Sequence, residues 1–219
     1  MIDFSAARRM MVDGQVRTAD VTDLRLLAAM GEVARERFVA RNQQALAYLD
    51  RDVPASDGGG AGRCLLKPMV LAKLIQLAEI EATDRVLDVG CATGYSSAVL
   101  ARLAGSVVAL EEDRALVAAA AQSLAAFSNV KVVNGLLMTG WPLAEPYDVI
   151  LMQGAVEVVP EAILSQLNDG GRLVCVFGDG PQRKAMLYRR SGAETSGRPM
   201  FDAAAPLLPG FSRKPAFVF

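Results

Sequence analysis

The apolar residues in the second half of the chain form short runs separated by segments with helical spacing. Helical patterns lie at 95–103, 113–127 and 160–167. Continuous apolar strands that alternate with helices are typical of a parallel sheet with helices on both faces. The sequence therefore predicts an α/β fold with a mostly parallel central sheet and strands at 86–89, 106–110, 130–133, 147–152 and 172–177.

Both ends of the chain depart from this alternation. Apolar residues recur at helical spacing before residue 40, with a stripe over 24–34 that Thr22 or Asp20 could cap. A helix is predicted from 69 to about 82. Segments 185–189 and 215–219 resemble strands without a helix between them, so we expect them to pair as an antiparallel edge.

We expect one domain over 1–219. Its parts are a helical N-terminal extension, 1–82, which contains a loop at 51–68, and an α/β core, 83–219. Glycines at 58–62 make part of that loop flexible by composition. The sequence leaves open whether these glycines belong to a lid over a ligand or to a surface excursion.

A glycine turn follows the first core strand, and acidic residues follow the second. Asp88 lies near the end of the first strand, Gly90 and Gly94 bracket the turn, and Glu111-Glu112 ends the next apolar run. Strand, glycine turn, helix, strand and acid is the layout of a nucleoside-binding unit, in which the acid accepts hydrogen bonds from ribose hydroxyls.

The spacing within the turn favours S-adenosylmethionine (SAM) over a dinucleotide. A dinucleotide motif G-x-G-x-x-G that begins at Gly90 would place Tyr95 where a third glycine lets helix and strand pack closely. An acid followed by G-x-G-x-G is typical of SAM-binding folds, with Ala92 here at the second glycine position. We therefore expect cofactor contacts from Asp88, Gly90, Cys91, Ala92, Gly94, Tyr95, Glu111 and Glu112.

Composition narrows the classes of partner. The chain has 219 residues, 52% hydrophobic and 21% charged, with a net charge of -1. This balance supports a large buried core and argues against a general electrostatic attraction to nucleic acid or to an anionic membrane. No apolar run approaches the roughly 20 residues of a membrane span. The N-terminal charges have no apolar block after them, so we expect no signal peptide and a cytoplasmic protein.

The chain contains no histidine and only three widely separated cysteines, Cys64, Cys91 and Cys175. The lack of imidazole removes the commonest general base and most transition-metal sites, so we expect no metal site. The cysteines are interpreted as small buried hydrophobes rather than as a disulfide framework. Any chemistry must proceed without imidazole.

Residues 86–95, V-L-D-V-G-C-A-T-G-Y, resemble the first motif of the protein-L-isoaspartate O-methyltransferases, V-L-E-I-G-T-G-S-G-Y. The resemblance covers nearly the whole chain, through matches at 11–17, 33–39, 47–50, 146–150, 159–164 and 167–174. It implies a Rossmann-like SAM-methyltransferase fold. It also implies methyl transfer from SAM to the α-carboxylate of isoaspartyl residues in damaged proteins or peptides, with S-adenosylhomocysteine (SAH) as product. A carboxylate is ionised at pH 7 and already nucleophilic, so this reaction suits a chain without histidine.

Three segments depart from the family pattern, and one of them, Gln153-Gly154-Ala155 after the fourth strand, replaces a T-A-A-like run. The active-site loop, G-Q-T-I-S-x-P in the family, is Gly62, Arg63, Cys64, Leu65, Leu66 and then Lys67-Pro68 here, so Leu66 replaces the serine and no catalytic residue is assigned. After the third strand the family has G-D-G, whose aspartate is expected to contact adenine. Leu136 and Leu137 follow Gly135 here. The resemblance places both leucines among the cofactor-binding positions.

Three hypotheses therefore remain at the level of sequence. The chain is an isoaspartyl methyltransferase with a peptide or protein acceptor, a SAM-dependent methyltransferase with a different and less polar acceptor, or a non-catalytic member that binds SAM, SAH or a protein partner. A dinucleotide enzyme is a weaker fourth alternative. The sequence does not determine the oligomeric state.

Overall fold

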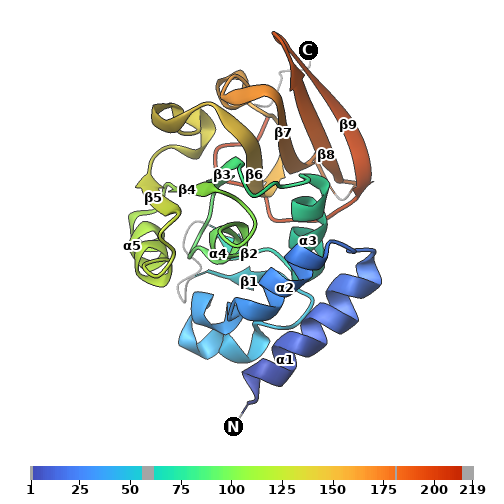
Figure 1. Ribbon diagram of the computed structural model, residues 1–219, viewed down its shortest axis with the longest axis vertical. Coiled ribbons are helices and arrows are strands. Elements are labelled where there is room, and N and C mark those ends of the chain that lie inside the picture. Colours follow the sequence, from blue (N-terminus) through green and yellow to red (C-terminus); the bar gives the residue numbers. More distant parts are fainter. Residues whose placement is uncertain (1, 56–61, 181, 214–219) are drawn as a thin grey trace, which may run out of the picture.

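A seven-stranded sheet with the order β5-β4-β3-β6-β7-β8-β9 forms the centre of the molecule (Figure 1). The computed structural model describes residues 2–55, 62–180 and 182–213. The parallel part consists of β3 (Arg85–Val89), β4 (Ser106–Glu111), β5 (Val130–Asn134), β6 (Tyr147–Val156) and β7 (Leu167–Phe177). The predicted α/β fold with a mostly parallel sheet is confirmed.

Side chains that alternate along each strand supply a separate apolar core on each face of the sheet. Val86 of β3 faces one core, whereas Leu87 and Val89 face the other. The first core is covered by α3 (Pro68–Leu77), α4 (Tyr95–Leu100) and α5 (Arg114–Ser123), and the second by α6 (Glu161–Leu164) together with Leu208 and Phe211. This two-sided burial explains why the strands are continuously apolar in sequence.

The N-terminal segment packs on the first of these cores and is coloured blue to cyan in Figure 1. It contains α1 (Phe4–Met11), α2 (Leu24–Glu32) and a two-stranded sheet of β1 (Val53–Pro54) and β2 (Cys64–Leu65), with shorter helical turns between them at Val12–Val16, Arg17–Ala19, Arg35–Phe38 and Arg41–Leu46. The expected caps of α2 are wrong, because Asp23 accepts hydrogen bonds from the backbone N–H groups of Arg25 and Leu26. The division into 1–82 and 83–219 stays a prediction.

The N-terminal segment is also tied to the glycine turn. Thr93 Oγ1 donates to the Phe38 carbonyl at 2.5 Å, and the rings of Phe38 and Tyr95 meet edge to face at 5.7 Å. The buried guanidinium of Arg35 lies 4.7 Å from the centroid of the Tyr95 ring and donates to the Leu66 carbonyl at 2.9 Å. The loop at 62–66 and the turn therefore belong to one packed unit.

The C-terminal sheet edge is antiparallel as predicted, but the pairing partner differs. β8 (Lys184–Ser191) pairs with β7 on one side and with β9 (Glu194–Asp202) on the other. β9 gives no strand pattern in the sequence, because most of its side chains are exposed and it contains Gly197 and Pro199. The segment expected to pair with β8, 215–219, lies outside the described residues.

Two further boundaries differ from the prediction. α6 ends at Leu164, and residues 168–171, predicted as a closing turn, lie within β7 because this strand begins to pair at Tyr147↔Leu167 before a register shift. The segment around Trp141 contains only the short helical turns Leu137–Thr139 and Pro142–Ala144. Among the described residues, no helix is both long and apolar enough to cross a bilayer.

Candidate functional site

The glycine turn connects the end of β3 to the start of α4. Backbone N–H groups of Gly90 and Cys91 donate to the Leu110 carbonyl of β4 at 2.8 and 3.1 Å, which holds the turn against the neighbouring strand. Gly90 and Gly94 have φ angles of 78° and 97°. Ala92 has φ 52°, a left-handed conformation that favours glycine and is uncommon for alanine. The alanine has thus kept the backbone conformation of a glycine position.

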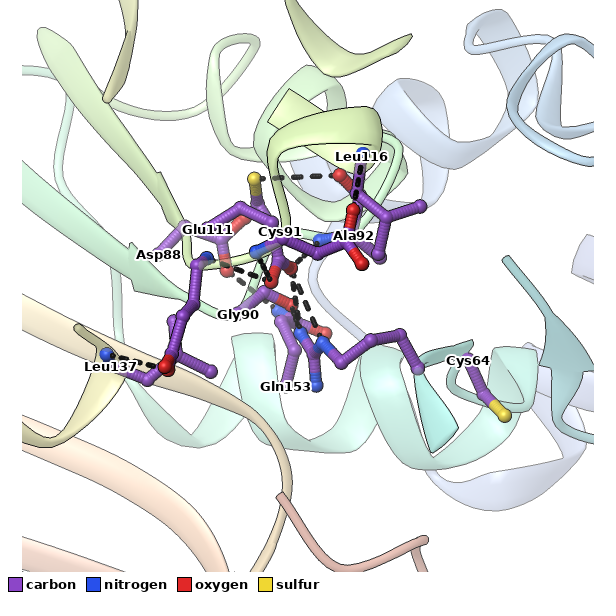
Figure 2. A network of polar contacts seen from close by, with 12 residues as sticks. Cys64, Asp88, Gly90, Cys91, Ala92, Glu111, Leu116, Leu137 and Gln153 are labelled. Carbon is purple, nitrogen blue, oxygen red and sulfur yellow. Dashed lines mark hydrogen bonds and ion pairs between the residues drawn. The ribbon is translucent and has the colours of Figure 1, made fainter. Parts of the chain in front are cut away.

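Glu111, at the end of β4, is the acid that faces this turn. Its carboxylate is fully buried, and Oε2 accepts from the Ala92 N–H at 2.8 Å. Oε1 accepts from the N–H groups of Glu112 and Asp113 at 2.9 and 3.3 Å. Glu112 is exposed, and its carboxylate accepts from the Leu137 N–H at 3.4 Å. The structure therefore distinguishes the two acids, and Figure 2 shows Glu111 beside Gly90 and Ala92.

Arg63 of the loop forms a buried ion pair with Glu111. Its Nε and Nη2 atoms lie 3.2 and 3.0 Å from Glu111 Oε2, and the two side chains are 3% and 0% exposed. Nη2 also donates to the Gly90 carbonyl. A Cβ atom added at Gly90 would overlap this guanidinium. Arg63 therefore packs directly against the backbone of the turn.

Asp88 is buried beneath the turn and is bonded by three side chains. It accepts from Ser96 Oγ at 2.6 Å, Ser97 Oγ at 2.5 Å and Gln153 Nε2 at 2.8 Å. Burial raises the pKa of Asp88, and these three donors oppose the shift. The carboxylate thus joins the start of α4 to β6, and the donors were not identified from sequence.

The remaining loop residues are mainly packing residues. Leu65 and Leu66 are buried, and the Leu66 side chain brings no hydroxyl to the position where the family has serine. Cys64 is half-buried, and burial raises the pKa of its thiol. Cys91 is buried in the turn, and burial raises the pKa of its thiol well above its ordinary value. Gly62 has φ 62° at the start of the loop.

Two spaces adjoin the turn. The first, about 10 Å³, has room for about one water molecule. The second, about 210 Å³, is lined by Arg63, Glu111, Glu112, Asp113, Leu137 and Pro209. Leu136 is 59% exposed and lines neither space. The predicted residues that line the first space are Cys64, Leu65, Leu66, Gly90, Cys91, Ala92 and Tyr95.

The C-terminal segment contributes residues that the sequence analysis missed. Leu208 donates its backbone N–H to Ala155 of β6 at 2.8 Å, and its side chain packs close to Gly90 and Gly154. Pro209 lines the larger space. No motif marks either residue. For Arg63, the only sequence signal was a positive charge in the loop opposite a pair of acids.

The described geometry can be compared with known proteins. The profile of the family described as Protein-L-isoaspartate(D-aspartate) O-methyltransferase (PCMT) matches residues 7–203. A Protein-L-isoaspartate O-methyltransferase of Methylorubrum populi is 39% identical over 208 residues, which cover 94% of this chain and 96% of that protein. One from Methanoregula boonei is 37% identical over 191 residues, 86% of each chain.

Solved structures show the same fold. A structure titled as a protein-L-isoaspartate O-methyltransferase superposes with a TM-score of 0.82 at 25% identity, over 92% of this chain and 66% of that chain. A Plasmodium falciparum protein solved in complex with SAH has a TM-score of 0.75 at 17% identity, over 92% of this chain and 97% of that chain.

Proposed function

The chain belongs to the protein-L-isoaspartate O-methyltransferase family, and we propose from this premise that it methylates isoaspartyl carboxylates with SAM as the methyl donor. The observation that carries the proposal is the position of Glu111, buried at the end of β4 and bonded to the glycine turn through the Ala92 N–H. In α/β sheets, ligands bind outside the carboxyl ends of the strands, which is where this acid lies.

The chemistry of the residues fits the cofactor. Glu111 is a fixed carboxylate of the kind that accepts ribose hydroxyls, and Gly90 has no Cβ to keep a ligand from the backbone. At Gly94 the space of a Cβ is filled by the Leu124 side chain, so this glycine serves packing. Leu137 gives the larger adjoining space an apolar wall suited to the adenine ring of the cofactor. When bound, SAM supplies an electrophilic methyl group. In this structure the Glu111 carboxylate is not free to accept a ribose hydroxyl, because it is paired with Arg63.

The rest of the reaction depends on position rather than on proton transfer. The attacking group is the carboxylate of the acceptor protein or peptide, which is ionised at neutral pH. The chain's role is therefore to orient that carboxylate and to exclude water. Leu66 offers no hydroxyl to it. Because loss of one transition-state donor costs about 10²–10³ in rate, we expect slow transfer.

A pair of peptides tests the proposal. An isoaspartyl peptide and its normal aspartyl twin are incubated with the protein and with SAM labelled in the methyl group. Label in the isoaspartyl peptide alone supports the assignment. Equal label in both peptides, or none in either, rejects isoaspartyl specificity.

A second candidate, methyl transfer to a less polar acceptor, is favoured by Leu66. The comparison of Leu66→Ser with Leu66→Ala separates the two acceptor classes. Both variants remove buried apolar volume at a cost of about 2–5 kcal/mol, so thermal unfolding must first show that they fold. Isoaspartyl labelling that is faster in Leu66→Ser than in Leu66→Ala and in the unaltered protein supports the family acceptor. Labelling in neither variant supports a changed acceptor.

A third candidate, a non-catalytic member, is favoured by the Arg63–Glu111 pair, because that pair occupies the proposed cofactor site. Calorimetry with SAH addresses this candidate. Binding without methyl transfer to either peptide would support it, whereas isoaspartyl labelling rules it out.

A further inference from the structure

Arg63 holds the carboxylate that the proposed cofactor needs. We propose that Arg63 is an internal competitor for the nucleoside site: its guanidinium occupies Glu111 and the Gly90 carbonyl, and SAM or SAH binds only when this side chain withdraws. The inference rests on the proposed function in one respect, namely that the competing ligand is SAM or SAH.

Glu111 has no acceptor capacity left for a ligand. Oε2 accepts from Arg63 Nε, Arg63 Nη2 and the Ala92 N–H. Oε1 accepts from the Glu112 and Asp113 N–H groups. A carboxylate offers about four lone-pair sites, so these donors already exceed its capacity. A ribose hydroxyl can reach Glu111 only by replacing one of them, and Arg63 is the only one of them that is a side chain.

The Arg63 side chain also fills the space that the cofactor would need beside the turn. The guanidinium of Arg63 lies where a Cβ at Gly90 would be, against the backbone that the cofactor must approach. The spaces that remain beside the turn are about 10 and 210 Å³. Ligand pockets typically measure about 300–1,000 Å³, so neither space holds a whole cofactor.

Withdrawal of Arg63 needs only a movement of its side chain. The Arg63 carbonyl accepts from the Ala55 N–H at 2.9 Å, which fixes the backbone of the loop at this residue. Glu111 retains three backbone N–H donors after Arg63 leaves. The acceptor therefore stays in position while the guanidinium exchanges the carboxylate for water.

A competitor of this kind lowers affinity by a predictable factor. The apparent dissociation constant equals the intrinsic one divided by the fraction of molecules that are open. If Arg63 is withdrawn in about 1–10% of molecules, its removal should tighten SAH binding about 10- to 100-fold.

Calorimetric titration of SAH into Arg63→Gln and the unaltered protein tests this. Gln removes the charge that pairs with Glu111, so we expect about tenfold tighter binding or more. Arg63→Lys keeps a charge but loses the two-pronged geometry, so its affinity should fall between the two. Arg37→Gln is the matched control, because Arg37 is exposed, and it should bind like the unaltered protein.

The outcomes separate this inference from the proposed function. If the unaltered protein binds SAH and Arg63→Gln binds no tighter, the competitor role is wrong and the methyltransferase proposal stands. If Arg63→Gln binds tighter but transfers no methyl group at saturating SAM, the competitor role stands and the methyltransferase proposal fails. If neither protein binds although both are folded, both are rejected.

A measurement on the unaltered protein covers the case in which Arg63→Gln does not fold. The buried Nε–H of Arg63 should give a slowly exchanging NMR signal that is missing in Arg63→Lys. Saturation with SAH should move this N–H into fast exchange with water. A slowly exchanging Nε–H in the SAH complex would overturn the competitor role.

Discussion

Arg63 and Glu111 lie 48 residues apart in sequence and meet as a buried ion pair, with Nη2 3.0 Å from Oε2. Removal of one partner of such a pair is costly, because the other charge is left in a poorly solvated place. The pair joins the loop before β2 to the end of β4. Both the stability of this region and its access to ligands therefore depend on the same two side chains.

Glu111→Gln should destabilise the protein much more than Glu112→Gln. The amide nitrogen of Gln would face donors in either orientation. At the Oε2 position it would face the Ala92 N–H and the Arg63 guanidinium, and at the Oε1 position the Glu112 and Asp113 N–H groups. We expect a loss of about 3 kcal/mol in the free energy of unfolding, at the low end for a broken buried pair because Arg63 can turn to solvent. Glu112 is exposed, so its variant should lie within about 0.5 kcal/mol of the unaltered protein. Urea unfolding measures both, and equal losses would contradict the assignment of Glu111 as the acid facing the turn.

Gly90→Ala should destabilise the turn and abolish SAH binding, because the new methyl group would itself stand against the backbone that the cofactor must approach, even when Arg63 has withdrawn. The new Cβ would overlap the Arg63 guanidinium and lie 3.2 Å from Leu208 Cδ2, and φ 78° is strained for alanine. We expect a cost of about 1–3 kcal/mol. Gly31→Ala is the control, because nothing lies within 4 Å of its Cβ and it is in helix α2, so it should gain about 0.5–1 kcal/mol. Thermal unfolding and SAH calorimetry measure the two effects. Undiminished SAH binding by Gly90→Ala would mean that the ligand does not approach this glycine.

Asp88 should make the protein less stable as the pH rises. Burial raises the pKa of Asp88 in the folded state above its ordinary value of about 3.9. Below that value the carboxyl is protonated in both states. As the pH rises from the ordinary pKa to the raised one, the unfolded chain loses the proton while the folded chain keeps it. The free energy of unfolding therefore falls over this range of pH.

Asp88→Asn should remove this dependence on pH. The serine hydroxyls can accept as well as donate, so the amide can be accommodated. Unfolding in urea at a series of pH values should show the stability of the unaltered protein falling relative to that of Asp88→Asn. Asp50→Asn, at an exposed position, should follow the unaltered protein. A constant difference between the unaltered protein and Asp88→Asn would show that the carboxylate is fully compensated by its donors.

Ala92→Gly should be neutral or stabilising, unlike most alanine-to-glycine changes. At φ 52° the strain relieved on removing the Cβ offsets the extra freedom that glycine has in the unfolded chain. Ala118→Gly makes the same change at an exposed position inside α5 and should cost about 1 kcal/mol. Chemical denaturation of both variants checks the contrast. A similar loss in the two would show that the turn tolerates alanine without strain.

The fold was predictable because its signals are local. The strands β3, β4 and β6 are apolar on both faces, and glycines mark the turn that follows β3. A short window of sequence was therefore sufficient to identify each strand. β9 was not predictable, because its exposed polar side chains give no periodic pattern. The helix boundary at Leu164 failed because the pairing of β7 with β6 decides where the strand begins.

The candidate site was predictable only in part. The sequence identified the turn and the pair of acids. It could not distinguish Glu111 from Glu112, because both lie at the same strand end. Only the tertiary structure shows that Glu111 faces inward. Arg63 was noted as a loop residue and not as the partner of Glu111. That contact joins residues 48 positions apart, and no periodicity or motif carries such information.

The backbone anchoring of Glu111 has an evolutionary consequence. Three main-chain N–H groups hold this carboxylate independently of the residue at position 63. A substitution at position 63 therefore changes the charge beside Glu111 and leaves the backbone contacts of its carboxylate in place. Under the proposed competitor role, single substitutions at position 63 tune the affinity for the cofactor without any change to the sheet or the turn.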